Sequence, residues 1–327
     1  MLRMGGLATA LLATFTLCAA TYSHAQDWPT RPVKIIVAFA PGGSADQFGR
    51  LIAPELSSTF KQQFFIENRP GNSGTIGAAQ VARADSDGYT LMIGGSGPHL
   101  TQPAINSNIG YDPLRDFTHI AMIGADSYAW AANPSLGVKS IAELIALAKT
   151  RQENRKDPIT SSSPGPGSLG HLLIEQFKRK AGIDIQHVPA PNSGLTDVLG
   201  NHISLTLTAM MTVGEQVKAG QLTALAVTST ERNPVFKGIA TFGEQGFPDV
   251  RGDTWFWLCG PKSLPADVVD KLSAATRRIV KSPKLQEHFR TLALLSKDLD
   301  VAATQSFIAE EYAFWAPLAK SAGLKVQ

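Results

Sequence analysis

Cysteine is almost absent from this chain of 327 residues, which contains only Cys18 and Cys259. Cys18 lies in an N-terminal segment that we expect to be removed, so no disulfide can form within one mature chain. The packing of side chains must therefore stabilise the fold. Cys259 lies in an apolar, aromatic run, and we expect it to be a buried and unreactive thiol.

A strong excess of one charge is also missing. The chain has 30 Lys and Arg against 27 Asp and Glu, which gives a net charge of +3, and it shows no stripe of basic residues. Nucleic acid is therefore not an expected partner. After the N-terminal segment, no apolar stretch reaches the length of a membrane span.

The N-terminal segment has the pattern of a signal peptide. Arg3 gives a short positive region, and Leu7 to Ala20 is apolar but too short to span a membrane. Ser23-His-Ala25 is a small-x-small cleavage site. We therefore expect residues 1–25 to be removed, Gln26 to be the mature N-terminus, and the protein to be exported.

Short apolar runs alternate with helical patterns through most of the chain, which predicts an α/β fold. The expected strands cover residues 33–39, 64–66, 90–93, 119–123, 159–162, 185–188, 203–207 and 222–227. A first helix is expected to start at residue 44, and further helices cover residues 75–84, 140–150, 168–181, 193–199, 213–219, 266–280, 283–294 and 303–322. Because the alternation restarts after Asn154, the pattern predicts two domains.

Two stretches stand apart from this alternation, and we interpret them as crossings between the domains. They are Tyr128 to Ala132 and Thr254 to Cys259. If both cross, domain 1 consists of residues 26–127 and 254–327 and holds both mature ends of the chain. Domain 2, residues 128–253, is then an insertion.

The segment from Val33 to Asp46 gives the clearest functional signal. It contains an apolar strand, a Pro-Gly-Gly turn and the start of an amphipathic helix. Ser44 and Gln47 have the spacing of a capping box. The free N–H groups and the dipole of a helix N-terminus favour an anion there.

Two alternatives stay open for this segment. The turn could simply connect a strand to a helix, without any ligand. Asp46 could belong to the site, or it could stabilise the helix N-terminus through its charge alone.

Five loops rich in glycine and hydroxyl side chains lie at transitions from strands to helices. In open α/β sheets such loops lie at the carboxyl ends of strands, where ligands bind. Together they predict a site rich in backbone donors and hydroxyl groups. The loops are Pro41 to Asp46, Arg69 to Gly74, Gly94 to Gly97, Ser161 to Ser168 and Pro191 to Gly194.

Patterns typical of enzymes are weak or missing. Gly165 to Gly170 formally matches a dinucleotide fingerprint, but three serines stand where an apolar strand should run. No nucleophile elbow, Walker loop or i, i+4 histidine pair occurs. His171 lies just inside a predicted helix, where a surface or capping role is a better interpretation than catalysis. We expect no cofactor, no metal and no enzymatic activity, and a secreted hydrolase is the rival interpretation.

Six short motifs follow one another along the chain. They are Trp28-Pro-x-Arg-Pro-Val-Lys-Ile-Ile-Val37, Pro41-Gly-Gly-Ser-Ala-Asp46, Glu67-Asn-Arg-Pro-Gly71, Ile76-Gly-Ala78, Asp87-Gly-Tyr-Thr-Leu91 and Leu225-Ala-Val-Thr-Ser229. In this order they resemble the Bug receptors, the periplasmic solute-binding proteins of tripartite tricarboxylate transporters. The likeness covers essentially the whole mature chain, and the combination is specific although each motif alone is not.

The resemblance implies a two-domain, type II periplasmic-binding-protein fold with the ligand in the cleft between the domains. It implies a monomeric receptor in the periplasm that captures a small organic carboxylate and delivers it to a membrane permease. No cofactor or metal is implied, and no chemistry is done on the ligand. A sensory binding protein without a transporter is a further alternative.

Carried onto this chain, the site of the family is formed by loops of both domains, which hold a carboxylate through backbone groups, hydroxyl groups and ordered waters. The expected ligand-binding residues are Pro41, Gly42, Gly43, Ser44, Ala45 and Asp46 in the first loop, Asn72, Ser73, Thr75, Ser96 and Gly97 beside it, and Ser162, Ser163, Gly165, Gly167, Ser168, Asn192, Ser193 and Thr208 in domain 2.

Two positions depart from the family pattern. Thr208 stands where many members have an Asp, and Trp257 where many have a Gly. Because strand side chains alternate, Tyr128 and Trp130 share one face of the first crossing. Trp255 and Trp257 likewise share a face of the second. Two interpretations follow: the rings Tyr128, Trp130 and Trp257 contact a flat or aromatic carboxylate, or they pack between hinge strands and helices.

Overall fold

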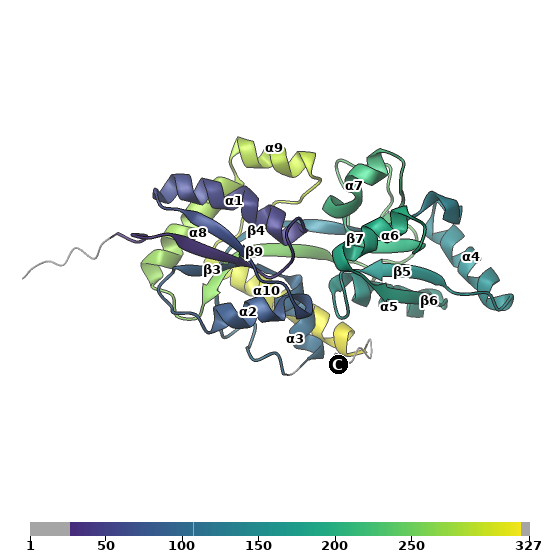
Figure 1. Cartoon of the computed structure of the whole chain (residues 1–327), viewed down its shortest axis with the longest axis horizontal. Coiled ribbons are helices and arrows are strands. Elements are labelled where there is room, and N and C mark those ends of the chain that lie inside the picture. Colours follow the sequence, from purple (N-terminus) through teal and green to yellow (C-terminus); the bar gives the residue numbers. More distant parts are fainter. Residues whose placement is uncertain (1–26, 107, 322–327) are drawn as a thin grey trace, which may run out of the picture.

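The computed structural model describes residues 27–106 and 108–321, so the predicted signal peptide and its cleavage site lie outside the described residues. In this part of the chain the strands form one sheet (Figure 1). The strands are β1 (Val33–Val37), β2 (Phe64–Asn68), β3 (Thr90–Gly95), β4 (Phe117–Ala132), β5 (Ile159–Ser163), β6 (Ile185–Pro189), β7 (Leu205–Ala209), β8 (Thr223–Val227) and β9 (Asp253–Pro261). Their order is β2-β1-β3-β9-β4-β7-β5-β6, and β8 pairs with β4.

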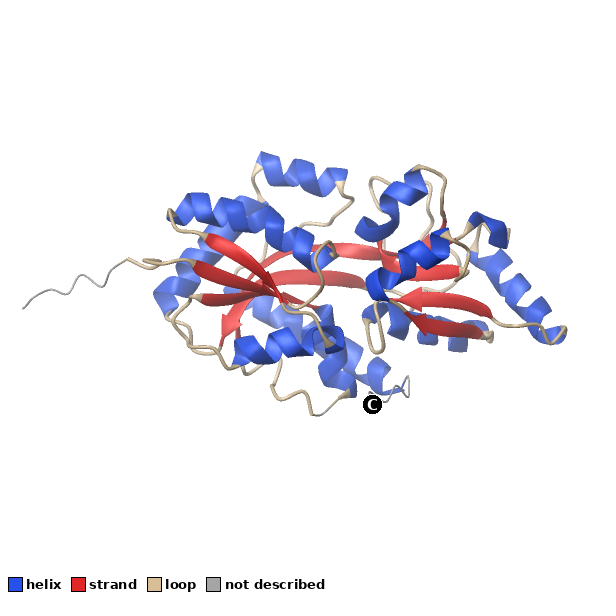
Figure 2. Cartoon of the chain, viewed as in Figure 1, coloured by secondary structure: helices blue, strands red, loops and turns tan. Residues whose placement is uncertain are grey.

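Helices lie on both sides of the sheet (Figure 2). They are α1 (Ser44–Phe60), α2 (Thr75–Ala82), α3 (Gln102–Ile105), α4 (Ile141–Glu153), α5 (Leu169–Ala181), α6 (Leu195–Leu199), α7 (Met210–Lys218), α8 (Ala266–Val280), α9 (Pro283–Thr291) and α10 (Val301–Ser321). Short helical turns form η1 (Asn72–Gly74), η2 (Gly97–Thr101), η3 (Pro134–Leu136) and η4 (Pro191–Gly194). The predicted alternation of strands and helices is confirmed. The sequence did not predict η2 and α3.

β4 is shared by two parts of the sheet. Its residues Phe117–Ser127 pair with β9, and its last five residues, Tyr128–Ala132, pair with β7 and β8 instead. We call β1, β2, β3, β9 and the paired part of β4 the first half, and β5 to β8 with Tyr128–Ala132 the second half. The separate segments expected at residues 119–123 and 128–132 are therefore one continuous strand.

The chain returns to the first half just before β9. Gly252 donates its N–H to the Thr228 carbonyl at the end of β8, and Thr228 donates its own N–H to Tyr128 O in β4. β9 then pairs with β3 and β4. By its pairing, the stretch Thr254 to Cys259 thus lies inside the first half.

The core explains why helices cover both faces. In the first half, Ile35 of β1 packs with Phe48 of α1 and Leu272 of α8 on one face of the sheet. On the opposite face, Ile36 packs with Val81 of α2. Strands of a parallel sheet are buried on both faces in this way, and their sequences are continuously apolar for that reason.

Parallel pairing fixes the position of the loops. β1 is parallel to β2 and β3, and β5 is parallel to β6 and β7. The loops that follow β1 and β5 therefore start at the carboxyl edges of their halves. Figure 1 shows the start of α1 near the middle of the molecule, where the halves meet. In the described part of the chain, no helix is both long and apolar enough to span a bilayer.

Candidate functional site

The loop between β1 and α1 is fixed by a buried carboxylate. Gly42 has a φ of +86°, which glycine tolerates, and donates its N–H to Asp46 Oδ2 at 2.9 Å. Asp46 is 2% exposed and also accepts hydrogen bonds from Asn68 Nδ2 (3.0 Å) and Arg50 Nε (2.8 Å). Burial alone would raise the pKa of Asp46, but these hydrogen bonds and the Arg50 charge lower it. The carboxylate of Asp46 thus holds the loop in shape.

The N-terminus of α1 has no side-chain cap. Its N-cap residue is Gly43. The capping-box prediction is wrong, because Ser44 is already helical and its hydroxyl donates to Asp126 Oδ2 at 3.1 Å. Gln47 Nε2 donates to the Gly42 carbonyl at 3.1 Å. Since the first N–H groups of a helix have no partner inside it, the start of α1 offers donors to an anion.

The loop between β5 and α5 is organised by histidine and serine side chains. Ser168 is the N-cap of α5, and its hydroxyl accepts the N–H of His171 at 3.3 Å. His171 is 9% exposed and accepts the N–H of Gly167 on Nδ1 at 3.1 Å, so it caps this loop from a buried position, not from the surface. Ser163 Oγ lies 2.7 Å from His187 Nε2 and 3.3 Å from Ser168 Oγ.

The main chain of this second loop touches the first half. The Pro166 carbonyl accepts hydrogen bonds from Ser73 Oγ and from Gln102 Nε2, each at 3.1 Å. Ser73 lies in η1 with a φ of +48°, and Gln102 is fully buried at the start of α3. A side chain at Gly165 would come within 3.9 Å of Ser73 Oγ. The structure therefore brings the predicted residues Ser73, Gly165 and Gly167 into one region.

Four hydroxyl side chains of the second half form one network. The Ser193 carbonyl accepts from Ser162 Oγ (2.6 Å) and Thr206 Oγ1 (2.8 Å). Thr208 Oγ1 donates to Ser193 Oγ at 2.7 Å. All four residues are buried. Ser162 and Thr208 thus use their hydroxyl protons inside the protein, whereas the proton of Ser193 Oγ remains available for another acceptor.

The remaining predicted residues lie around these loops. Ser96 is buried, and its hydroxyl accepts the N–H of Trp255 at 3.1 Å. Thr75 Oγ1 donates to the Asn72 carbonyl at 3.0 Å. A side chain at Gly97 would meet the Ser73 carbonyl at 3.1 Å. Pro41 and Gly42 are exposed, Gly43 and Ser44 are half-buried, Ala45 is buried, and the side chain of Asn192 lies outside the described part.

Asp126 is the polar residue at this site that sequence reasoning missed. It lies in β4 with no exposed surface, where Ser44 Oγ donates to Oδ2 and the N–H of Met211 lies 3.3 Å from Oδ1 and 3.2 Å from Oδ2. One carboxyl therefore contacts the start of α1 in the first half and the start of α7 in the second. The signal in the sequence was a single acid inside a long apolar strand.

The prediction of aromatic contacts with a ligand is wrong for two of the three rings. Trp130 has no exposed surface, packs against Phe177 at 4.8 Å between ring centroids, and donates its indole N–H to Ser161 Oγ. Trp257 is also fully buried and donates to His119 Nδ1 at 3.0 Å. Both rings pack the core, as the alternative interpretation proposed. Tyr128 is 6% exposed and stays a prediction.

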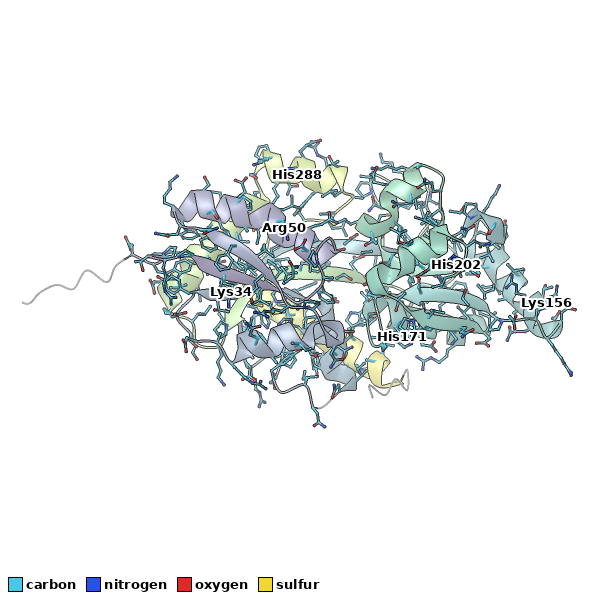
Figure 3. All side chains as sticks on the ribbon, viewed as in Figure 1. Lys34, Arg50, Lys156, His171, His202 and His288 are labelled. Atoms are coloured by element: carbon cyan, nitrogen blue, oxygen red, sulfur yellow. The ribbon has the colours of Figure 1, made fainter. Side chains whose placement is uncertain are left out.

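A cationic side chain of these loops, Arg69, is exposed and paired with Glu67. The labelled Lys34, Arg50 and Lys156 lie far apart on different elements (Figure 3). Arg50 is paired with Asp46. In the described residues, no group of three or more His, Cys, Asp or Glu side chains is arranged to hold a metal ion. The site therefore offers an anion backbone N–H groups, hydroxyl groups and helix dipoles.

Cys259 behaves as the sequence predicted. It has no exposed surface, and burial raises the pKa of its thiol well above the ordinary value. A thiol that stays protonated is a poor nucleophile and a poor metal ligand. We therefore assign it to the core.

Residues 48–324 match the family described as "Tripartite tricarboxylate transporter family receptor". BugT of Bordetella pertussis is 30% identical over 327 residues, covering 98% of this chain and 99% of BugT. The structure of R. palustris Rpa4515 with adipate is 33% identical with a TM-score of 0.85, covering 91% of this chain and 99% of that one. MatC from Rhodopseudomonas palustris with bound malate is 25% identical with a TM-score of 0.81, covering 89% and 99%.

These likenesses extend over nearly the whole length of both partners in each comparison. They confirm the two-domain fold of periplasmic binding proteins that the sequence predicted. Their family is one of solute-binding receptors and not a class of enzymes. The chain belongs to the receptor family of the tripartite tricarboxylate transporters.

Proposed function

We propose that this chain is a periplasmic receptor that captures a small organic carboxylate between its two halves and delivers it to a membrane permease. The uncapped N-terminus of α1, which faces the region where the halves meet, is the observation that supports this best. Its N–H groups and dipole would bind one carboxylate end of the ligand. Adipate and malate in the two relatives are ligands of this kind.

The second loop completes the proposed site. Through Pro166 it already lies against Ser73 and Gln102. Glycine at positions 165 and 167 keeps side chains away from the loop, and Ser193 offers a hydroxyl proton. We propose residue 128 as the boundary into domain 2 and residues 252–254 as the return to domain 1. We also propose that the receptor is a monomer and that its two domains enclose the ligand.

We also propose that the receptor does no chemistry on its ligand. Ser163 and His187 are at the distance of a nucleophile and a base, but Ser163 has no exposed surface. Burial, together with the neighbouring His171, lowers the pKa of His187 to about 4. An imidazole with this pKa is a weak base at neutral pH.

A thermal-shift and calorimetry screen tests the proposed function. The probes are adipate, malate, citrate, aspartate and benzoate. A ligand that binds only the native state at 100 times its Kd stabilises it by about 2.7 kcal/mol. We expect at least one of these carboxylates to raise Tm.

Gly43→Val locates the site in the same screen. A Cβ at Gly43 would lie 3.6 Å from the Ala40 carbonyl, an ordinary contact, so the variant should fold while its side chain blocks the approach to α1. Gly238→Val, at an exposed glycine with nothing within 4 Å of the added Cβ, is the matched control. Binding that survives Gly43→Val unchanged would contradict the proposed position.

A further inference from the structure

The carboxyl group of Asp126 occupies an unusual position for a receptor of anions. It has no exposed surface and lies at the point where β4 passes from one half to the other. Its oxygens accept the Ser44 hydroxyl at 3.1 Å and the Met211 N–H at 3.2 and 3.3 Å. Ser44 is also a predicted ligand-binding residue, so Asp126 competes with a bound carboxylate for the same donor.

The charged and titratable groups around Asp126 do not neutralise it. Asp253 of β9 adds like charge, and Tyr128 of β4 is itself affected by the charge of Asp126. The charge of Glu311 in α10 acts on Asp253, and the charges of Arg251 and Lys297 act on Glu311. From α1 the Ser44 hydroxyl donates to Asp126, and from α7 the N–H groups of Met211 and Met210 do so.

These surroundings favour a proton on Asp126. Burial, opposed by the Met211 and Ser44 hydrogen bonds and assisted by the charge of Asp253, raises the pKa of Asp126 to about 8. A neutral carboxyl can still accept a hydrogen bond on its carbonyl oxygen and lie near an anionic ligand. An ionised carboxyl would repel the ligand in a region from which water is excluded.

Neighbouring polar atoms lack partners in the same region. Ser127 and Asp253 are directly paired across β4 and β9, and Ser127 Oγ and Asp253 Oδ1 are buried without any hydrogen bond. Buried polar groups are normally satisfied by protein, water or ligand. Ser127 Oγ and Asp253 Oδ1 are therefore two polar atoms near Asp126 that lack a hydrogen-bond partner within the described protein.

We propose that Asp126 is a specificity-determining residue of the carboxylate site, which admits an anionic ligand only while its own carboxyl group holds a proton. This inference rests on the proposed function and extends it. Binding of a dicarboxylate is then coupled to proton uptake. Ionisation of Asp126 and binding of the anion exclude one another.

The coupling has a definite sign. Because the pKa of Asp126 is raised to about 8, we expect it to lose its proton between pH 7 and pH 9 in the free protein, and an anion bound beside it would raise this pKa further. Affinity for a dianion should therefore fall by about tenfold between pH 7 and pH 9. Adipate suits this test because both of its carboxyl groups are ionised throughout the range.

The experiment is isothermal titration of the full mature chain with adipate and with malate at pH 7 and pH 9. We expect the wild type and the exposed-acid control Asp85→Asn to show the loss of affinity, and Asp126→Asn to bind equally at both values. A second measurement needs no variant: the binding heat of the wild type at pH 8 in phosphate and in Tris buffer should differ, because a proton is taken up.

The outcomes separate the two proposals. Binding by the wild type with the same affinity at pH 7 and pH 9, and with the same heat in both buffers, would overturn the role of Asp126 and leave the receptor function intact. A pH dependence that persists in a folded Asp126→Asn variant would also overturn it. Failure of every carboxylate in the screen to bind the wild type would overturn the proposed function and this inference with it.

Discussion

At the scale of single residues, buried histidines in this chain act as neutral hydrogen-bonding groups. His119 Nδ1 accepts the indole N–H of Trp257 at 3.0 Å, so Nε2 holds the proton and donates to the Pro113 carbonyl at 3.1 Å. Burial lowers the pKa of His119 to about 4. His171 and His187 stack at 3.7 Å between ring centroids, and burial lowers the pKa of each to about 4.

These lowered pKa values predict how His119 contributes to stability. The unfolded chain binds a proton at His119 below about pH 6.5, whereas the native state does so only near pH 4. The contribution of neutral His119 to the free energy of unfolding is therefore complete above pH 6.5, and it is lost as the pH falls through the pKa of the native state. We expect the destabilisation caused by His119→Gln to be largest at pH 7 and to shrink toward pH 4.5.

Urea denaturation of both proteins at several pH values measures this difference. The quantity to compare is the difference in the free energy of unfolding between variant and wild type. In the wild type alone, the raised pKa of Asp126 makes stability change with pH in the opposite direction. His202→Gln, at an exposed position, is the control. A constant difference across the pH range would show that His119 does not titrate as expected.

At the scale of elements, the second loop depends on how closely α5 approaches β7. A Cβ at Gly170 would lie 2.6 Å from the Leu207 carbonyl and 3.1 Å from the Tyr128 ring. The first turn of α5 can therefore rest directly on the backbone of β7. Gly170 is the last glycine of the stretch Gly165 to Gly170, which matches a dinucleotide fingerprint only formally. Its role is to allow this close contact between α5 and β7.

Gly170→Ala should displace the first turn of α5. Overpacking of this kind typically costs about 1–3 kcal/mol, which exceeds the helix propensity gained from alanine. We also expect weaker ligand binding, because Ser168 and the second loop move with the helix. Chemical denaturation and calorimetry measure the two effects, and Gly238→Ala is the control. Unchanged stability and affinity would show that α5 has space that the packing does not indicate.

The whole molecule is held together across its halves by few polar contacts. Ser73 and Gln102 donate to the Pro166 carbonyl, and Ser44 and Met211 meet at Asp126. The two halves also share β4, Asn233 Nδ2 donates to the Ala293 carbonyl at 2.9 Å, and α10 packs against α5. Such an arrangement favours hinge motion, with the polar contacts formed in the closed state.

Small-angle scattering tests this hinge. We expect the radius of gyration to decrease when a saturating carboxylate is added. The double variant Ser73→Ala/Gln102→Ala removes two hydrogen bonds of about 1 kcal/mol each from the closed state, so its affinity should fall by roughly tenfold or more. Ser135→Ala, which removes an exposed hydroxyl contact with Asn201, is the control. An identical radius with and without ligand would argue against closure.

The sequence predicted those features that depend on neighbouring residues. The strand that begins at Val33 and the helix expected over residues 168–181 follow from local patterns, and the structure has them as β1 (Val33–Val37) and α5 (Leu169–Ala181). Asp126 was missed because its partners lie 82 and 85 residues away in the chain. Trp130 and Trp257 were misplaced because alternation gives the face of a strand, but it does not tell whether that face meets a ligand or a helix.

The sharing of β4 by both halves also has a consequence for synthesis, which proceeds from the N-terminus. β3 and β4 are joined in the sheet only through β9, whose residues Asp253–Pro261 emerge after the entire second half. Until then β3 keeps an unpaired edge, of the kind that recruits foreign strands. The second half can therefore fold early, whereas the first half stays incomplete until the chain is nearly finished. The N-terminal strands are thus the part of the chain that would need chaperones for the longest time.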